Sequence, residues 1–186
     1  MTPGRSVLVV GVGNVERGDD GVGPFVASRL AGALPPGAAV RVRGDDVLAL
    51  VDDCADRDAL VCVDCAAADS MPGRVHRFDI GRGDMLPRGL GTLSSHGHDL
   101  ASALALAHAL GVLPGQVVVY AVEGEAFDLG RGLTPAVERS ASGLADSIRA
   151  EITALLDMRQ VGAPQHRPPP GTALRTDGAG PRCDNH

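Results

Sequence analysis

Aromatic side chains are scarce in this 186-residue chain: they make up 2% of it, with no Trp, one Tyr and three Phe. Proteins that bind single-stranded nucleic acid stack its bases on aromatic side chains, and phosphate backbones are bound by basic surfaces. Here the formal net charge at pH 7 is −6. Both features argue against nucleic-acid binding, and the core has to be built from Val, Leu, Ala and Ile.

The chain also lacks a long hydrophobic run and a disulfide framework. No apolar stretch approaches the roughly 20 residues that a membrane-spanning helix needs. The N-terminal apolar run ends in a glycine-rich loop, so we interpret it as a first strand and not as a signal peptide. Four cysteines are too few for a disulfide framework in a chain of this length. We therefore expect a cytoplasmic monomer with reduced thiols and no membrane contact.

Cysteine chemistry offers no obvious site either. Cys62 and Cys65 form C-x-x-C, but a structural zinc site needs four ligands and the chain has no second pair. A thioredoxin-like motif begins a helix, whereas Cys62 stands inside an apolar run that predicts a strand. We expect Cys62 in the core and Cys65 beside a crevice. The G-x-S-x-G elbow of serine hydrolases is absent from the sequence.

Segments with strand and helix patterns alternate along the chain. Continuous apolar runs indicate buried strands, period-two alternation indicates half-exposed strands, and three-to-four spacing indicates helices. The predicted strands are 6–12, 39–43, 59–63, 74–80 and 116–122, and the predicted helices are 21–34, 45–55, 99–110 and 134 to about 158. Asp45 is the expected N-cap of the second helix, and strand 74–80 is expected to be an edge or antiparallel strand. The alternation predicts a three-layer α/β/α fold with a twisted, mostly parallel sheet of about five strands.

The last residues of the chain differ in composition from the rest. Residues 161–186 hold five Pro and four Gly, with Val161 and Leu174 as their only larger aliphatic residues. Such a stretch buries too little apolar surface to offset the entropy lost on ordering. We predict one α/β domain over residues 1–160 and a disordered tail over 161–186.

The segment GVGNVERGDDGVG, residues 11–23, joins the first predicted strand to the first helix, where many α/β proteins bind a nucleotide. A dinucleotide fingerprint requires G-x-G-x-x-G, but Glu16 stands at its last position. A phosphate loop requires Gly-Lys-Ser/Thr, and Asp19-Asp20-Gly21 stands there. A helix N-terminus favours these carboxylates, and they would repel a phosphate. The loop is predicted to present anions, and a nucleotide-binding module is the disfavoured alternative.

Three separated residues are candidates for a common site. One of Asp19 and Asp20 could simply cap the helix, but Asp64 ends a second buried strand, and the carboxyl ends of strands form the functional crevice of open α/β sheets. The long loop before the third helix carries His96 and His98. Two carboxylates and one imidazole suit a divalent metal such as nickel or zinc. Residue chemistry alone leaves the choice between His96 and His98 open.

Four blocks of the sequence together resemble the hydrogenase maturation endopeptidases, over about residues 6–157. They are Gly11-Val12-Gly13-Asn14 with Gly18-Asp19-Asp20-Gly21-Val22-Gly23, Val63-Asp64-Cys65, Ser94-Ser95-His96 and Gly132-Leu133-Thr134-Pro135. The resemblance implies a mostly parallel sheet between helices with one antiparallel strand. It also implies an activity: removal of a short C-terminal extension from a [NiFe]-hydrogenase large-subunit precursor after nickel insertion.

By matching position, the resemblance implies that Asp20, Asp64 and His96 contact the metal, with nickel carried by the precursor. Peptide hydrolysis would then be of the aspartic type, with Asp20 or Asp64 as general base, or metal-dependent. Some members carry Glu at the position of Asp20, and many have Pro soon after the Glu where this chain has Glu123-Gly124-Glu125. The alternatives are a nickel-binding hydrogenase assembly factor without proteolytic activity, and a protease of other precursors.

Overall fold

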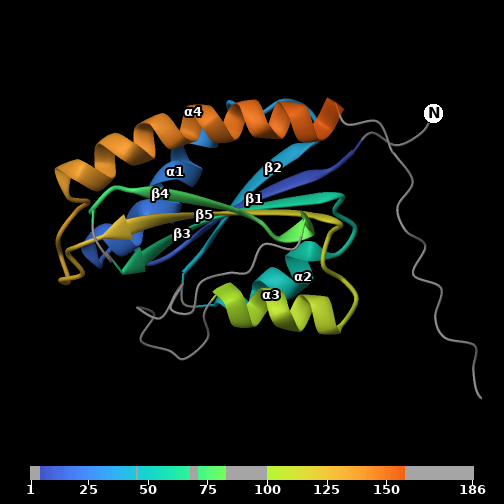
Figure 1. The fold of residues 1–186 in the computed structure, drawn as a ribbon, viewed down its shortest axis with the longest axis horizontal. Helices are drawn as coiled ribbons and strands as arrows, with labels where there is room; N and C mark the ends of the chain where they lie inside the picture. The colour runs from blue at the N-terminus through green and yellow to red at the C-terminus, as the bar shows by residue number, and fades with distance from the viewer. Residues whose placement is uncertain (1–4, 45, 68–70, 83–99, 158–186) are drawn as a thin grey trace, which may run out of the picture.

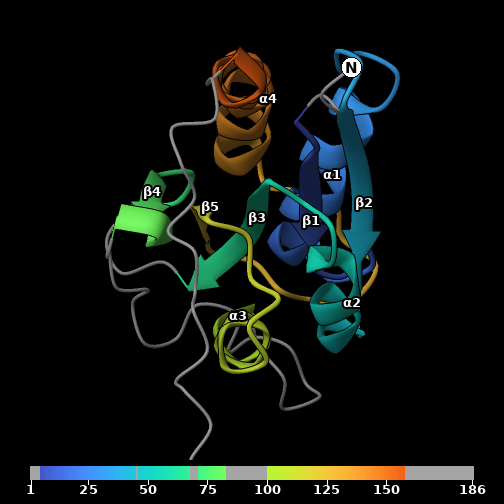
Figure 2. The same cartoon turned by 90° about the vertical axis from the view of Figure 1, so that its right-hand side faces the viewer.

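The computed structural model describes residues 5–44, 46–67, 71–82 and 100–157. They form a five-stranded sheet with helices on both faces (Figures 1 and 2), with the strand order β2-β1-β3-β5-β4. The strands are β1 (Val7–Val12), β2 (Ala38–Arg43), β3 (Ala59–Ala67), β4 (Val75–Asp79) and β5 (Gln116–Gly124). All neighbouring strands pair in parallel except β4, which pairs antiparallel with β5 at one edge. The predicted fold class is confirmed, as is the antiparallel edge strand.

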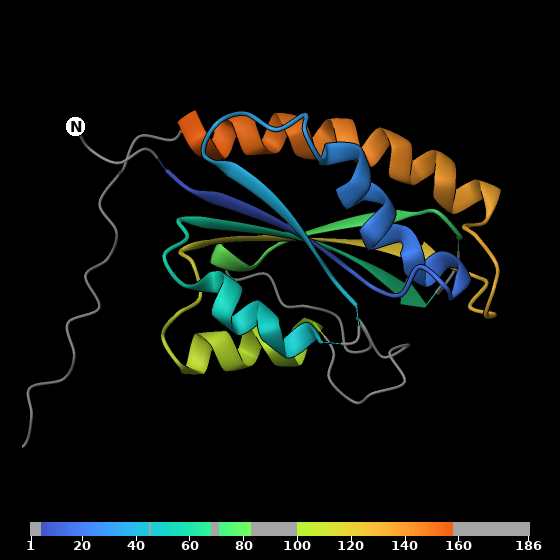
Figure 3. The same cartoon turned by 180° about the vertical axis from the view of Figure 1, so that it is seen from behind.

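Two helices cover each face of the sheet, as Figure 3 shows from behind. The helices α1 (Val22–Leu30) and α4 (Pro135–Asp157) lie on one face, and α2 (Leu50–Cys54) and α3 (Leu100–Ala109) lie on the other. Three short 3-10 helices, η1 (Gly18–Gly21), η2 (Val47–Ala49) and η3 (Ile80–Arg82), complete the described elements. None of the helices in these ranges is long and apolar enough to span a membrane.

Alternation along the strands separates the core into two layers. In β3, Val61, Val63 and Cys65 pack in the cluster under α1 and α4, whereas Leu60 and Cys62 pack in the cluster over α2 and α3. Successive side chains of a strand point to opposite faces, and both faces of this sheet are covered, which explains why the central strands are mostly apolar. The prediction that Cys62 belongs to the core is confirmed.

Several predicted boundaries need correction. The strand predicted to end at Val63 continues as β3 to Ala67, so Asp64 lies inside the strand. Residues Asp64 to Ala67 pair in register with β5, and a pairing with a distant strand does not show in an apolar pattern. The first helix begins later than predicted, at Val22 with Gly21 as its N-cap. Asp45 lies outside the described residues, and Asp46 caps η2 by accepting from the Ala49 N–H.

Candidate functional site

Asp20 and Asp64 both lie close to the carboxyl end of β1, Asp20 in η1 and Asp64 in the adjacent strand β3. The parallel register pairs Gly11 of β1 with Val63 of β3, so Asp64 is the next residue along β3, near Val12, the last residue of β1. Just beyond this end, the main-chain N–H of Asn14 donates a 2.8 Å hydrogen bond to Oδ2 of Asp20. The structure therefore brings together, at the end of the sheet where the parallel strands terminate, two carboxylates that are 44 positions apart in the sequence.

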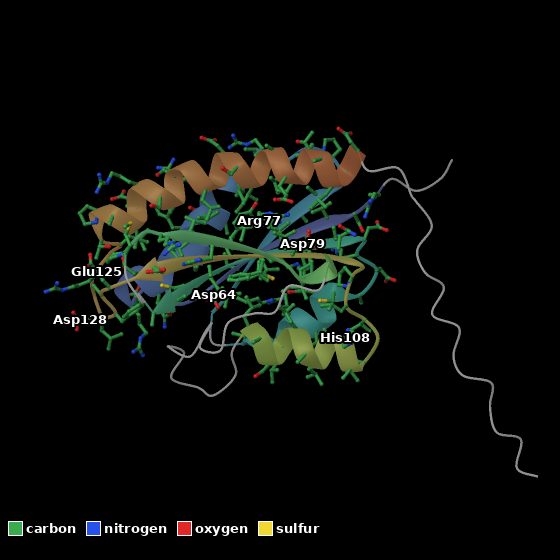
Figure 4. The ribbon with its side chains drawn as sticks, viewed as in Figure 1. Asp64, Arg77, Asp79, His108, Glu125 and Asp128 are labelled. Atoms are coloured by element: carbon green, nitrogen blue, oxygen red, sulfur yellow. The ribbon has the colours of Figure 1, made fainter. Side chains whose placement is uncertain are left out.

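Both carboxylates are buried, with 7% of Asp20 and 2% of Asp64 exposed. Oδ1 of Asp64 accepts a 2.8 Å hydrogen bond from the N–H of Cys65. The side chain of Asp64 lies on the face of the sheet that α3 covers (Figure 4). Burying a carboxylate is costly unless it is paired or hydrogen-bonded, so this arrangement is typical of a residue with a task beyond packing.

The thiol of Cys65 is buried beside acidic groups. Burial raises its pKa well above the ordinary value, and the negative charges of Asp64, Asp20 and Asp19 raise it further. A negative charge nearby disfavours the thiolate. Cys65 is fully buried and uncharged at neutral pH, which is the opposite of what a nucleophilic cysteine needs.

Asp19 serves the fold, and the sequence did not reveal this. Its carboxylate is fully buried and accepts four hydrogen bonds from the segment that joins β5 to α4. The donors are the N–H groups of Glu125 at 2.9 Å, Ala126 at 3.2 Å and Thr134 at 2.7 Å, and the Thr134 hydroxyl at 3.1 Å. Asp19 thus ties η1 to the start of α4, which leaves Asp20 as the acid available to the site.

A glycine next to Asp20 allows η1 to fold back on β1. Gly13 has a φ of +128°, and a Cβ there would lie 1.9 Å from the main-chain oxygen of Asp20. No other residue type fits so close to a backbone oxygen. The glycines of segment 11–23 therefore serve close backbone approach, without a phosphate.

A second polar pair lies near the carboxyl end of β5, the strand next to β3. Glu123, near the end of β5, is buried, and its Oε1 lies 2.7 Å from Nε2 of His76 in β4. Its Oε2 accepts a 2.9 Å hydrogen bond from the N–H of Met71. Glu123 was noticed in the sequence only as a departure from the family pattern, because its partner His76 is 47 positions away.

An apolar pocket of about 380 Å³ borders η1, because Gly18 and Gly21 contribute to its lining. Its lining includes Val15, Phe25 and Leu133, with Glu138 as its charged residue. An apolar pocket whose charged residue is a glutamate does not suit a phosphate group, because like charges repel. This pocket adds to the case against nucleotide binding.

The remaining predicted site residues cannot be placed. His96 and its competitor His98 lie outside the described residues, as does the tail over 161–186. Within the described ranges, no group of three or more His, Cys, Asp or Glu side chains is arranged to hold a metal ion. The described part of the predicted metal site is the carboxylate pair, Asp20 and Asp64.

Comparisons with known proteins agree with the resemblance. A family model described as hydrogenase maturation protease matches residues 32–151, a range that includes Asp64 and begins after Asp20. A provisionally named hydrogenase maturation protease of Methanocaldococcus jannaschii is 31% identical over 157 residues, covering 80% of this chain and 97% of the relative.

Solved structures share the fold. The hydrogenase maturating endopeptidase HybD from Escherichia coli superposes with a TM-score of 0.66 at 23% identity, over 80% of this chain and 93% of that one. The [NiFe] hydrogenase maturation protease HybD from Thermococcus kodakarensis superposes with a TM-score of 0.64 at 23% identity, over 79% of this chain and 99% of that one.

Proposed function

The chain belongs to the hydrogenase maturation protease family, and we propose that it removes the C-terminal extension of a [NiFe]-hydrogenase large-subunit precursor after nickel insertion. The observation that carries this proposal is the pair of buried carboxylates near the carboxyl end of β1, Asp20 in η1 and Asp64 in the adjacent strand β3. The same proposal has the protein act in the cytoplasm as a monomer, with the precursor as its partner.

In this proposal the nickel of the precursor is part of the substrate. Carboxylate oxygens and an imidazole nitrogen suit a divalent transition metal, and Asp20, Asp64 and His96 would supply that donor set. Three protein ligands leave coordination positions for groups of the precursor. A precursor without metal would lack these contacts, so the protease would recognise the nickel-loaded form.

Two routes to peptide hydrolysis fit the carboxylate pair. Asp20 or Asp64 accepts a proton from water as general base, or the nickel polarises the scissile carbonyl and activates water. A cysteine route is disfavoured, because burial and three nearby carboxylates keep the Cys65 thiol protonated. The hydrolysis is therefore proposed to be of the aspartic type or metal-dependent.

Cleavage of the nickel-loaded precursor tests the proposal directly. We expect a mass decrease equal to the extension with the wild-type chain, and a loss of rate of at least about 100-fold for Asp20→Asn, Asp64→Asn and His96→Ala. Asp128→Asn is the control, because its side chain is 75% exposed at the surface (Figure 4) and it should cleave at the wild-type rate.

The outcomes separate the alternatives. Full processing by all three site variants would show that the site assignment is wrong. Binding of the precursor without any mass change would favour the nickel-binding assembly factor that does not cut. Stabilisation by a dinucleotide, with none by nickel, would revive the nucleotide-binding module.

A further inference from the structure

His76 stands in one row with Asp64 across the sheet. Asp64 of β3 pairs in register with Ala121 of β5, and Ala121 pairs with His76 of β4. Paired residues share a face of the sheet, and neighbouring strands lie about 4.8 Å apart, so the backbones at Asp64 and His76 are about 10 Å apart. Ala121 is the residue between them in this row. The imidazole of His76 therefore lies on the same face of the sheet as the carboxylate of Asp64, the face that α3 covers.

Glu123 determines which ring nitrogen of His76 is available. Its side chain is 4% exposed, and Oε1 lies 2.7 Å from Nε2 of His76, whose side chain is 33% exposed. An ionised carboxylate only accepts hydrogen bonds, so Nε2 carries the hydrogen and Nδ1 is an acceptor in the neutral ring. No residue in the described ranges hydrogen-bonds Nδ1.

A structural role for Glu123 does not account for the imidazole. The connection between β3 and β4 is tied to β5 by the N–H of Met71 on Oε2, the N–H of Gly73 on the Glu123 carbonyl, and the Glu123 N–H on the Arg74 carbonyl. These bonds use the carboxylate and the backbone and need no ring. The ring is instead held in orientation, since it also stacks on Phe78 with a centroid distance of 6.3 Å.

We propose that His76 contacts the precursor, its Nδ1 accepting a hydrogen bond from a main-chain N–H of the polypeptide, and that Glu123 is the positioning residue that sets this tautomer. The proposal rests on the proposed function, because the ligand is the polypeptide that the site processes. β4 is at the edge of the sheet, and no strand in the described ranges pairs with its outer side. The N–H and C=O groups of an edge strand can pair with another chain.

Two substitutions separate contact from tethering. His76→Gln keeps a donor for Glu123 near the position of Nε2 and removes the acceptor at Nδ1. Glu123→Gln keeps an oxygen for the Met71 N–H but turns an amide donor toward the ring, which moves the ring hydrogen to Nδ1. For each we expect a KM for the nickel-loaded precursor about three- to tenfold higher, the effect of one lost hydrogen bond, with kcat unchanged.

His108→Gln is the matched control, because His108 is exposed near the far end of α3 (Figure 4). The KM of this variant for the precursor should equal that of the wild type. Nitrogen chemical shifts of the imidazole should show hydrogen on Nε2 in the wild type and on Nδ1 in Glu123→Gln. Thermal unfolding midpoints of both variants should stay at the wild-type value.

The proposal is overturned if His76→Gln processes the precursor with the wild-type KM, or if KM rises only together with a lowered unfolding midpoint. If the wild-type chain does not cleave, the proposed function is wrong, and the contact is tested by calorimetric binding of the same precursor. A three- to tenfold weaker Kd for His76→Gln then supports the contact, and an equal Kd overturns it.

Discussion

Asp19 and Asp20 are neighbours in sequence that the fold assigns to different tasks. The carboxylate of Asp19 is surrounded by donors from the β5–α4 segment, whereas that of Asp20 accepts from Asn14 at the end of β1. The two adjacent acids of η1 therefore bind different parts of the chain.

Substitution of each acid by Asn separates stability from processing. Asp19→Asn places an amide among buried donors, so we expect the free energy of unfolding to fall by about 2–4 kcal/mol. Asp20→Asn should cost about 1 kcal/mol or less while processing is lost. Urea denaturation measures the stability of each variant, and precursor cleavage measures its activity. If Asp20→Asn were less stable than Asp19→Asn, the division of roles would be wrong.

Helix α1 packs on β1 and β3 at a distance that only glycine allows. A Cβ on Gly23 would lie 2.2 Å from the Val12 carbonyl oxygen and 2.6 Å from that of Val63. Both atoms belong to strand backbone and cannot yield without disturbing the sheet. The helix that follows Asp20 is thereby held against the two strands whose ends carry the site.

Gly23→Ala should therefore destabilise the protein by several kcal/mol, because it forces α1 away from the sheet. Gly143→Ala is the matched control: this residue lies within α4, and a Cβ there meets nothing within 4 Å. Since Ala is about 1 kcal/mol better than Gly inside a helix, the control should raise stability by up to that amount. Thermal unfolding of both variants checks the opposite signs.

At the scale of the whole molecule, a polar contact joins the sheet to the α4 layer. The hydroxyl of Tyr120 in β5 donates a 2.5 Å hydrogen bond to Glu151 of α4, and Arg77 of β4 makes two further bonds to the same carboxylate. Burial, followed by the hydrogen bond to Glu151, raises the pKa of Tyr120 to about 12. The chain has no other tyrosine, so its titration reports on this contact alone.

The sign of the pH effect follows from that shift. The unfolded chain loses the phenolic proton near pH 10, and the folded chain retains it to about pH 12. The stability contributed by the neutral tyrosine is therefore complete below about pH 10 and is lost as the pH rises toward 12, by on the order of 2 kcal/mol. Tyrosinate absorbance of the folded protein, compared with the protein in urea, measures both pKa values.

Tyr120→Phe provides the control for this prediction. The variant lacks the titrating group, so its stability should not decline through the same mechanism in that pH range. An equal decline in both proteins, or a tyrosinate midpoint near 10 in the folded state, would contradict the assignment.

The alternation of apolar segments predicted the layers, the antiparallel edge strand and the approximate positions of the five strands and the four α-helices, but not η1 or η3. This succeeded because burial on one face or both leaves a local period in the sequence. Boundaries that depend on distant partners were less predictable: β3 continues past Val63 because Asp64 to Ala67 pair with β5. Likewise η1 is held by hydrogen bonds from the distant β5–α4 segment to Asp19. The predicted helix began at Gly21, whereas α1 begins at Val22, after η1.

The sequence by itself determined the fold class and the family resemblance, because strand and helix periods and glycine spacing are local features. Asp20 and Asp64 were proposed as site residues by their position in the blocks that carry the resemblance. Only the tertiary structure decided that Asp19 holds α4, and that Glu123 holds His76 in line with Asp64. These partners are 115 and 47 positions apart. Hydrogen bonds between such distant positions depend on strand order, and a local period carries no information about which strands become neighbours.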